Sequence, residues 1–345
     1  MSAEPANAAV VPEGRRAPAR APRWRPGAGL IGLVASAALL AVLYRGLDIR
    51  LIGATLARAN PLWLLVSVLL ILPITFLRGL RFYWVAPRGA LPSVTEAFRL
   101  TVVSSALNVF LPAKSGDLVK SYFVATRSGT SAGVSVAIVI YERLCDMACL
   151  IAWCMVGWVV GKPEVPGLPA WFWPLLGLVG VACGLLIVSG RLATALLKAV
   201  VRLLPSKVPR KLVDLASGWP DLLVALRGRR TQILLFSLVL WLAHLCQIWL
   251  FTVTLSADVP FTVSASLSAV ALLAGQLPLT LAGIGTRDVA LVLLLARYMP
   301  AESAAALGIL IATRNFLPPL FGLPFIGPYM SSILDEARRW RSGTA

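Results

Sequence analysis

The chain has 345 residues, of which 58% are apolar and 14% are charged. This composition excludes a soluble protein, because apolar runs near the ~20 residues that a helix needs to cross a bilayer fill most of the sequence between Gly27 and Tyr329. The net charge of +17 does not indicate nucleic-acid binding, since Lys and Arg concentrate beside the apolar runs, where they set topology and contact anionic lipid. We therefore expect an all-α polytopic membrane protein whose partners are membrane lipids and not nucleic acid.

The N-terminal region combines a basic segment with the first apolar run. Residues 1–27 contain five arginines among Pro and Ala, which predicts a disordered, basic cytoplasmic tail. Residues 28–44 are apolar, and no A-x-A cleavage site follows them. This run is therefore predicted to be an uncleaved first span.

Apolar runs of similar length recur along the chain. Six full spans are predicted at 28–44, 61–86, 131–160, 171–190, 231–256 and 302–329. Segments 94–127 and 262–299 are interrupted by Pro and Gly, so we predict two re-entrant hairpins that return to the side they entered. If the hairpins are counted as spans, there are up to eight transmembrane segments.

Basic residues orient these spans. The 191–230 connection carries nine Lys or Arg and is predicted to be cytoplasmic, either as an amphipathic helix on the inner leaflet or as a solvated connector. The 161–170 loop and the turn at Asp258 then face the outer side. Residues 330–345 form a second cytoplasmic tail.

Two charge pairs indicate an internal duplication. Asp117 precedes Arg143 by 26 residues, and Asp288 precedes Arg314 by the same 26 residues. An offset of 171 residues superimposes the pairs without a gap and relates two units of span, span, hairpin and span. Because the first unit starts inside and the second outside, residues 28–160 and 161–329 are predicted to be inverted transmembrane repeats.

Charged side chains at membrane depth define the candidate site. Irregular backbone survives there only where protein or a water-filled cavity supplies hydrogen bonds, and the helix N-termini that follow such loops favour an anion. The predicted substrate-binding residues are Lys114, Asp117, Lys120, Glu142, Arg143, Asp146, Arg287, Asp288, Arg314 and Asn315. The predicted turn residues are Pro112, Gly116, Pro278, Gly283 and Gly285. The alternative is that Asp117–Arg143 and Asp288–Arg314 are structural ion pairs that touch no substrate.

Other polar residues in the spans have simpler interpretations. His244, the only histidine, is predicted to be a packing residue rather than a proton relay. Arg78 and Arg81 beside Trp84 are predicted to anchor their helix at the membrane interface, and the alternative for Arg78 is a deeper position in contact with lipid headgroups. Five cysteines lie inside apolar runs without the spacing of a zinc site. With no P-loop and no cluster of metal ligands in the sequence, we expect neither a metal nor a cofactor.

Three motifs resemble the lysylphosphatidylglycerol synthase transmembrane-region family, also called flippase-like. They are Pro112-Ala-Lys114-Ser-Gly116-Asp117-Leu-Val-Lys120, Glu142-Arg143-x-x-Asp146 and Gly283-Ile-Gly285-Thr-Arg-Asp288, and the resemblance covers roughly residues 30–330. The family usually has Arg and Glu in the first motif where this chain has Lys114, Asp117 and Lys120, and Glu in place of Asp288. The charge signs are kept, but the lysines lose bidentate geometry.

The resemblance implies a domain that moves lipids between leaflets of the bacterial inner membrane, without the soluble aminoacyl transferase domain of some members. The basic residues beside the spans predict that both termini are cytoplasmic. We expect a lipid translocase, rather than an enzyme, for an anionic or phosphate-bearing lipid such as a phospholipid, a polyprenyl-linked lipid or a hopanoid-pathway lipid. One alternative is a membrane-embedded lipid-modifying transferase, with Glu142, Asp146 or Asp117 as general base. The other is a non-catalytic partner of a lipid- or glycan-synthesis enzyme.

Overall fold

The computed structural model describes residues 26–110, 116–128, 131–203, 210–276, 280 and 283–341. Three predicted site residues, Pro112, Lys114 and Pro278, lie outside these ranges. In the described ranges the regular elements are α-helices, which confirms an all-helical polytopic membrane protein.

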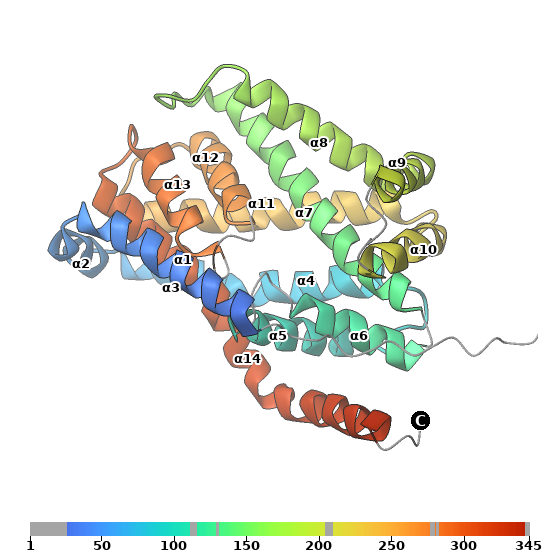
Figure 1. Cartoon of the computed structure of the whole chain (residues 1–345). Helices are drawn as coiled ribbons and strands as arrows, with labels where there is room; N and C mark the ends of the chain where they lie inside the picture. Colours follow the sequence, from blue (N-terminus) through green and yellow to red (C-terminus); the bar gives the residue numbers. More distant parts are fainter. Residues whose placement is uncertain are drawn as a thin grey trace, which may run out of the picture.

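The helices follow the predicted spans closely (Figure 1). In chain order they are α1 (Pro26–Arg45), α2 (Ile49–Ala57), α3 (Pro61–Leu69), α4 (Ile71–Val85), α5 (Val94–Phe110), α6 (Asp117–Ser128), α7 (Ala132–Gly161), α8 (Phe172–Val188), α9 (Gly190–Leu203), α10 (Arg210–Ala225), α11 (Arg230–Thr254), α12 (Phe261–Ala274), α13 (Thr286–Leu295) and α14 (Ala301–Arg341).

Over the described residues, four stretches are long and apolar enough to cross a membrane alone: Pro61–Val85, Gly133–Gly161, Arg230–Thr254 and Ala301–Tyr329. Two bent pairs raise the number to as many as six, because α1 turns by 90° into α2 and α8 turns by 110° into α9. These six correspond to the six predicted full spans.

Local hydrogen bonds explain both bends. The Asp48 side chain accepts hydrogen bonds from the amides of Arg50 and Leu51 and so starts α2 as a new helix. At the second bend, Ser189 accepts from the amide of Leu192, while the Arg230 guanidinium donates to the carbonyl of Val188 at 3.0 Å. These contacts satisfy backbone groups that a broken helix leaves without partners.

The two predicted hairpins are pairs of short packed helices, α5 with α6 and α12 with α13. The 14 residues of α12 and the 10 of α13 are too few to cross a hydrocarbon core about 30 Å thick at about 1.5 Å per residue. A glycine turn precedes α13: Gly283 has φ +77° and Gly285 has φ +100°, values that favour glycine.

Two polar contacts identify which segments lie together at each end of the molecule. At one end the Glu164 carboxylate pairs with Arg297 at 2.9 Å, so the loop before α8 meets the loop before α14. At the other end the Tyr329 hydroxyl donates to Glu96 at 2.8 Å, so the far part of α14 meets the start of α5. The hairpins α5–α6 and α12–α13 therefore open at opposite ends, on the right and left of Figure 1.

The last helix of each predicted repeat packs on the hairpin of the other, α7 on α12 and α14 on α5. These contacts are close, since a Cβ atom on Gly157 would lie 2.5 Å from the Thr262 carbonyl oxygen and one on Gly322 would lie 2.4 Å from that of Val102. Each of two hydrophobic clusters also combines residues from both halves, such as Leu150 with Leu267 and Tyr141 with Leu222. The two halves thus share their packing, while their origin as inverted repeats stays a prediction.

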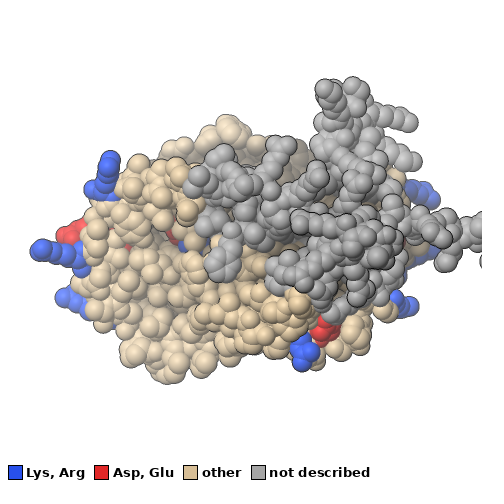
Figure 2. Space-filling model, turned by 60° about the horizontal axis from the view of Figure 1, so that its bottom comes forward, with Lys and Arg blue, Asp and Glu red and all other residues tan. Residues whose placement is uncertain are grey.

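The surface agrees with a membrane-embedded molecule. In Figure 2 most Lys and Arg side chains lie toward the two ends of the described surface, and the described surface between them is mostly uncharged. Exposed large apolar residues populate the spanning helices, including Leu178 on α8 and Val239 on α11. Such a belt suits contact with lipid tails.

Candidate functional site

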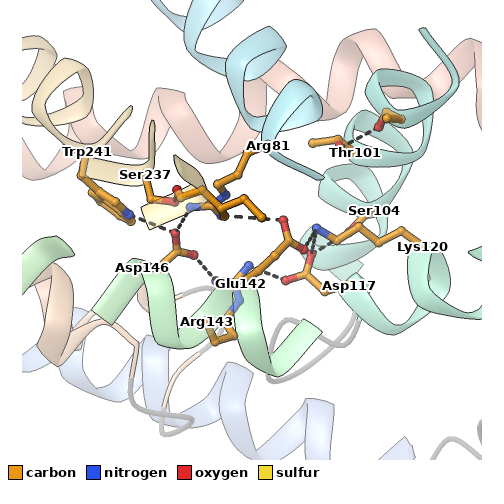
Figure 3. A network of polar contacts seen from close by, with 12 residues as sticks. Arg81, Thr101, Ser104, Asp117, Lys120, Glu142, Arg143, Asp146, Ser237 and Trp241 are labelled. Carbon is orange, nitrogen blue, oxygen red and sulfur yellow. Dashed lines mark hydrogen bonds and ion pairs between the residues drawn. The ribbon is translucent and has the colours of Figure 1, made fainter. Parts of the chain in front are cut away.

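A buried ion network connects α4, α6 and α7 (Figure 3). Arg81 Nη1 lies 2.6 Å from Asp146 Oδ1, and Arg81 Nη2 lies 3.7 Å from Glu142 Oε1. Lys120 Nζ is 2.7 Å from Glu142 Oε2 and stands over the ring of Phe82. One turn of α7 thus places Glu142 and Asp146 on the face that receives both cations.

Asp117, the first residue of α6, joins the same network. Its carboxylate lies 2.5 Å from Arg143 Nη2 and 3.8 Å from Lys120 Nζ. It also accepts from Ser104 at 2.7 Å and from Asn108 at 3.3 Å, both on α5. The structure therefore forms the Asp117–Arg143 pair that the 26-residue spacing suggested.

The network is electrically balanced. Three bases, Arg81, Lys120 and Arg143, face three acids, Asp117, Glu142 and Asp146. Trp241 of α11 donates to Asp146 at 2.9 Å and links the network to the second half of the chain. Buried charges are retained in this way when each has a partner and further hydrogen bonds.

The second half is arranged differently. Asp288 accepts from the Gly285 amide at 2.9 Å and from Arg287 Nη2 at 2.6 Å, and Arg287 also donates to the Gly308 carbonyl at 3.0 Å. Arg314 makes no ion pair with a carboxylate of the described residues. The prediction that Asp288 and Arg314 form a structural ion pair is therefore wrong.

The register of the hairpin on its following helix explains this difference. Asp117 meets Arg143 on α7, whereas Asp288 packs against Gly308 on α14, where a Cβ would lie 2.6 Å from Asp288 Oδ1. Gly308 precedes Arg314 by six residues, which is about 9 Å along a helix at about 1.5 Å per residue. That separation removes Arg314 from the reach of Asp288.

Arg314 contacts His244 Nδ1 instead. A guanidinium has only donors, so Nδ1 accepts and the imidazole proton sits on Nε2 in a neutral ring. His244 is therefore more than the packing residue that the sequence suggested, because it positions an arginine and presents an N–H group. Arg314 Nε is buried and has no hydrogen-bond partner in the described part of the chain.

A cavity of about 210 Å³ lies between these groups. It is lined by five arginines, which are Arg78, Arg81, Arg143, Arg287 and Arg314, and by one carboxylate of the described residues, Asp146. Amide side chains of Asn108, Gln247, Gln276 and Asn315 complete its polar wall. The wall is built from α4, α5, α7, α11, α12, α13 and α14, so both halves of the chain contribute.

The predicted site residues divide into two groups. Arg143, Asp146, Gly283, Arg287, Arg314 and Asn315 line the cavity. Asp117, Lys120, Glu142 and Asp288 are buried behind the wall and hold lining arginines or each other. Gly116 packs so tightly on α5 that a Cβ would lie 2.5 Å from the Ser104 carbonyl oxygen.

Two lining arginines were assigned differently from the sequence. Arg78 and Arg81 were predicted to anchor α4 at the interface, but Arg81 is 3% exposed and both residues line the cavity. Their position inside an apolar span and their spacing of three residues, which places them on one helix face, are the signals that could have identified them.

Arg78 makes neither an ion pair nor a hydrogen bond over the described residues. Since the network and the Arg287–Asp288 pair are each balanced, Arg78 and Arg314 are left as two positive charges without acid partners on the cavity wall. An uncompensated charge at membrane depth is costly. The arrangement suits the binding of an anion.

Among the described residues, no group of three His, Cys, Asp or Glu side chains lies close enough together to hold a metal ion. The five cysteines are free thiols, and four of them are buried.

The model of one protein family matches most of the chain. The family is described as the lysylphosphatidylglycerol synthase TM region, and the match covers residues 29–322. The comparison with curated proteins gives no match.

Proposed function

Because the chain belongs to the lysylphosphatidylglycerol synthase TM region family, a membrane domain associated with lipid-related function, we propose that it is a lipid translocase. It moves the anionic, phosphate-bearing headgroup of a membrane lipid between leaflets through the arginine-lined cavity. The acyl tails stay in the surrounding bilayer.

The pair of arginines without acid partners carries this proposal. Arg78 and Arg314 face one cavity of about 210 Å³ from α4 and α14, which come from different halves of the chain. A guanidinium binds phosphate oxygens through a fixed fork of donors. A phosphate placed between these arginines would receive donors from both halves at once.

An apolar rim beside the cavity supports a lipid as the bound molecule. Phe316, which lines the cavity, is 46% exposed, and Leu320, one turn further along α14, is 58% exposed. A headgroup held by arginines would therefore lie next to a surface that suits lipid tails.

The hairpins supply a means of alternating access. They open at opposite ends, and each packs on the last helix of the other half. In transporters built from repeats, one repeat rocks against the other around a central site. Rocking of the first repeat against the second, which keeps α6 on α7 and α13 on α14, would expose the cavity to each side in turn.

The same proposal places both termini on the cytoplasmic side of a bacterial inner membrane. The basic α9–α10 region supports this orientation, since Lys and Arg favour the cytoplasmic side. Arg230 ties the ends of α8 and α10 together on that side.

The transferase alternative has less support, because each candidate base is already engaged by cations. Asp117, Glu142 and Asp146 each contact at least one of Arg81, Lys120 and Arg143 within the buried network. These contacts occupy the carboxylate oxygens that a general base would have to present to a substrate.

Translocation in proteoliposomes tests the proposal. Purified protein would be reconstituted with headgroup-labelled anionic or zwitterionic lipids, and Arg78→Gln and Arg314→Gln would be compared with wild type. We expect anionic lipid to move at least tenfold faster with wild type than with either variant. Arg297→Gln is the matched control, because it removes an exposed arginine outside the cavity.

Two results would overturn the proposal. One is movement of anionic lipid that is unchanged in both cavity variants. The other is a change in the mass of the lipid on incubation with folded protein, which would indicate the transferase.

A further inference from the structure

We propose that the cavity selects a phosphomonoester headgroup over a phosphodiester. This inference rests on the proposed lipid translocase and names its substrate class. A phosphomonoester carries about −1.5 to −2 charges at pH 7, because its second pKa is about 6. A phosphodiester lacks that second ionisation and carries a single negative charge.

Charge balance is the first argument. The network of Arg81, Lys120 and Arg143 with three acids is neutral, and so is the Arg287–Asp288 pair. Among the described residues that line the cavity, Arg78 and Arg314 then contribute two positive charges. A dianion cancels both charges, whereas a monoanion leaves one of them unpaired in a low-dielectric site, which is costly.

The available donors give the second argument. Arg78 forms no hydrogen bond with the described residues, and the buried Nε of Arg314 has no partner. The neutral ring of His244 offers its Nε2–H group, because Arg314 already occupies Nδ1. A monoester presents three terminal oxygens to such a set, and a diester presents two.

The size of the cavity gives the third argument. Its volume of about 210 Å³ lies below the roughly 300–1,000 Å³ typical of pockets for drug-sized ligands. That space suits a phosphate with a short link to the tails.

Binding can be measured separately from transport. Purified protein in a phosphate-free detergent would be titrated with short-chain phosphatidic acid, short-chain phosphatidylglycerol or inorganic phosphate, and the shift in thermal unfolding would report affinity. We expect phosphatidic acid to bind at least tenfold more tightly than phosphatidylglycerol at pH 7.5. Inorganic phosphate should bind more weakly than phosphatidic acid, because it lacks the tails that contact the apolar rim.

Two comparisons test whether the second negative charge of the phosphomonoester causes the preference. Lowering the pH to 5.5 protonates the monoester, so the preference for phosphatidic acid should fall several-fold while binding of phosphatidylglycerol stays constant. Arg78→Gln or Arg314→Gln should remove most of the preference at pH 7.5, and Arg297→Gln should retain it.

Equal affinity for the two lipids at pH 7.5, or a preference that persists in both cavity variants, would overturn the inference. Inorganic phosphate binding as tightly as phosphatidic acid would overturn it as well, by identifying a free anion as the ligand. Equal translocation of both lipids would support the proposed lipid translocase and reject only the selection of a phosphomonoester. Tight binding of phosphatidic acid without translocation would reject the proposed lipid translocase but support the cavity as a phosphomonoester-binding site.

Discussion

At the residue scale, Asp117 has an unusual number of partners for a single carboxylate. It contacts Arg143 and Lys120 and accepts hydrogen bonds from Ser104 and Asn108, so it joins three helices. Removing one member of a buried ion network leaves its partners charged and unpaired. The acid therefore stabilises the fold by keeping the two cations paired.

Asp117→Asn should lower the free energy of unfolding by about 3–5 kcal/mol, the usual cost of breaking a buried ion pair. Thermal or denaturant unfolding in detergent would measure the loss. Glu164→Gln is the control: it breaks the exposed pair with Arg297 at 2.9 Å, and exposed pairs contribute only about 0–1 kcal/mol. Similar losses in the two variants would show that the network does not stabilise the fold.

The candidate site was only partly predictable from single residues. The Asp117–Arg143 contact followed from spacing, because the α6–α7 turn is short and both charges needed a partner in an apolar setting. The contact of Arg314 with His244 did not follow, because it joins α11 to α14 across 70 residues of sequence. A single sequence also does not reveal the register shift that moves Asp288 to Gly308.

At the scale of elements, close packing of α7 on α12 depends on a residue without a side chain. A Cβ on Gly157 would lie 2.5 Å from the Thr262 carbonyl oxygen and 2.9 Å from Ser266 Cβ. Backbone at that distance cannot move aside cheaply. The contact therefore fixes how the last helix of one half holds the hairpin of the other.

Gly157→Ala should destabilise the protein by about 1–3 kcal/mol, the typical cost of overpacking, although alanine favours a helix by about 1 kcal/mol. Gly184→Ala is the matched control, because Gly184 also lies four residues before the end of a spanning helix and a Cβ there meets nothing within 4 Å. Unfolding temperatures in detergent would separate the two. A stable Gly157→Ala protein would contradict the close approach.

Helix positions were largely predictable because each span is a long apolar run. The bend after α1 was not, since the apolar run continues into the short helix α2. The bend after α8 was implicit in one of the two expectations for residues 191–230, the amphipathic helix on the inner leaflet. Asp48, whose side chain caps α2, is the local signal that could have indicated the first bend. The packing of α7 on α12 joins residues about a hundred positions apart, and periodicity within one segment carries no information about such a partner.

At the scale of the whole molecule, the loops lie in two groups, one at each end of the membrane-spanning helices. Glu164 lies with Arg297 at one end, whereas Arg88 lies beside Arg229 at the other end, near the start of α11. With α3–α4, α7, α11 and α14 crossing the membrane, these two ends belong to opposite sides.

Cysteine labelling tests this division. Glu164→Cys and Arg88→Cys, each made singly, should react with a membrane-impermeant thiol reagent from opposite sides of sealed vesicles, because both positions are exposed. The unaltered chain is the control, since four of its five cysteines are buried and the fifth is partly buried. Labelling of both variants from one side would reject the arrangement of the hairpins.

The two arginines without acid partners also have an electrical consequence. Moving one elementary charge through a membrane potential of 100 mV is worth about 2.3 kcal/mol. An empty cavity keeps the charges of Arg78 and Arg314, whereas a cavity that holds a dianion is neutral. The membrane potential would therefore act on the conformational change of the empty protein and determine the side to which its empty cavity opens. The conformational change with lipid bound would not depend on the potential.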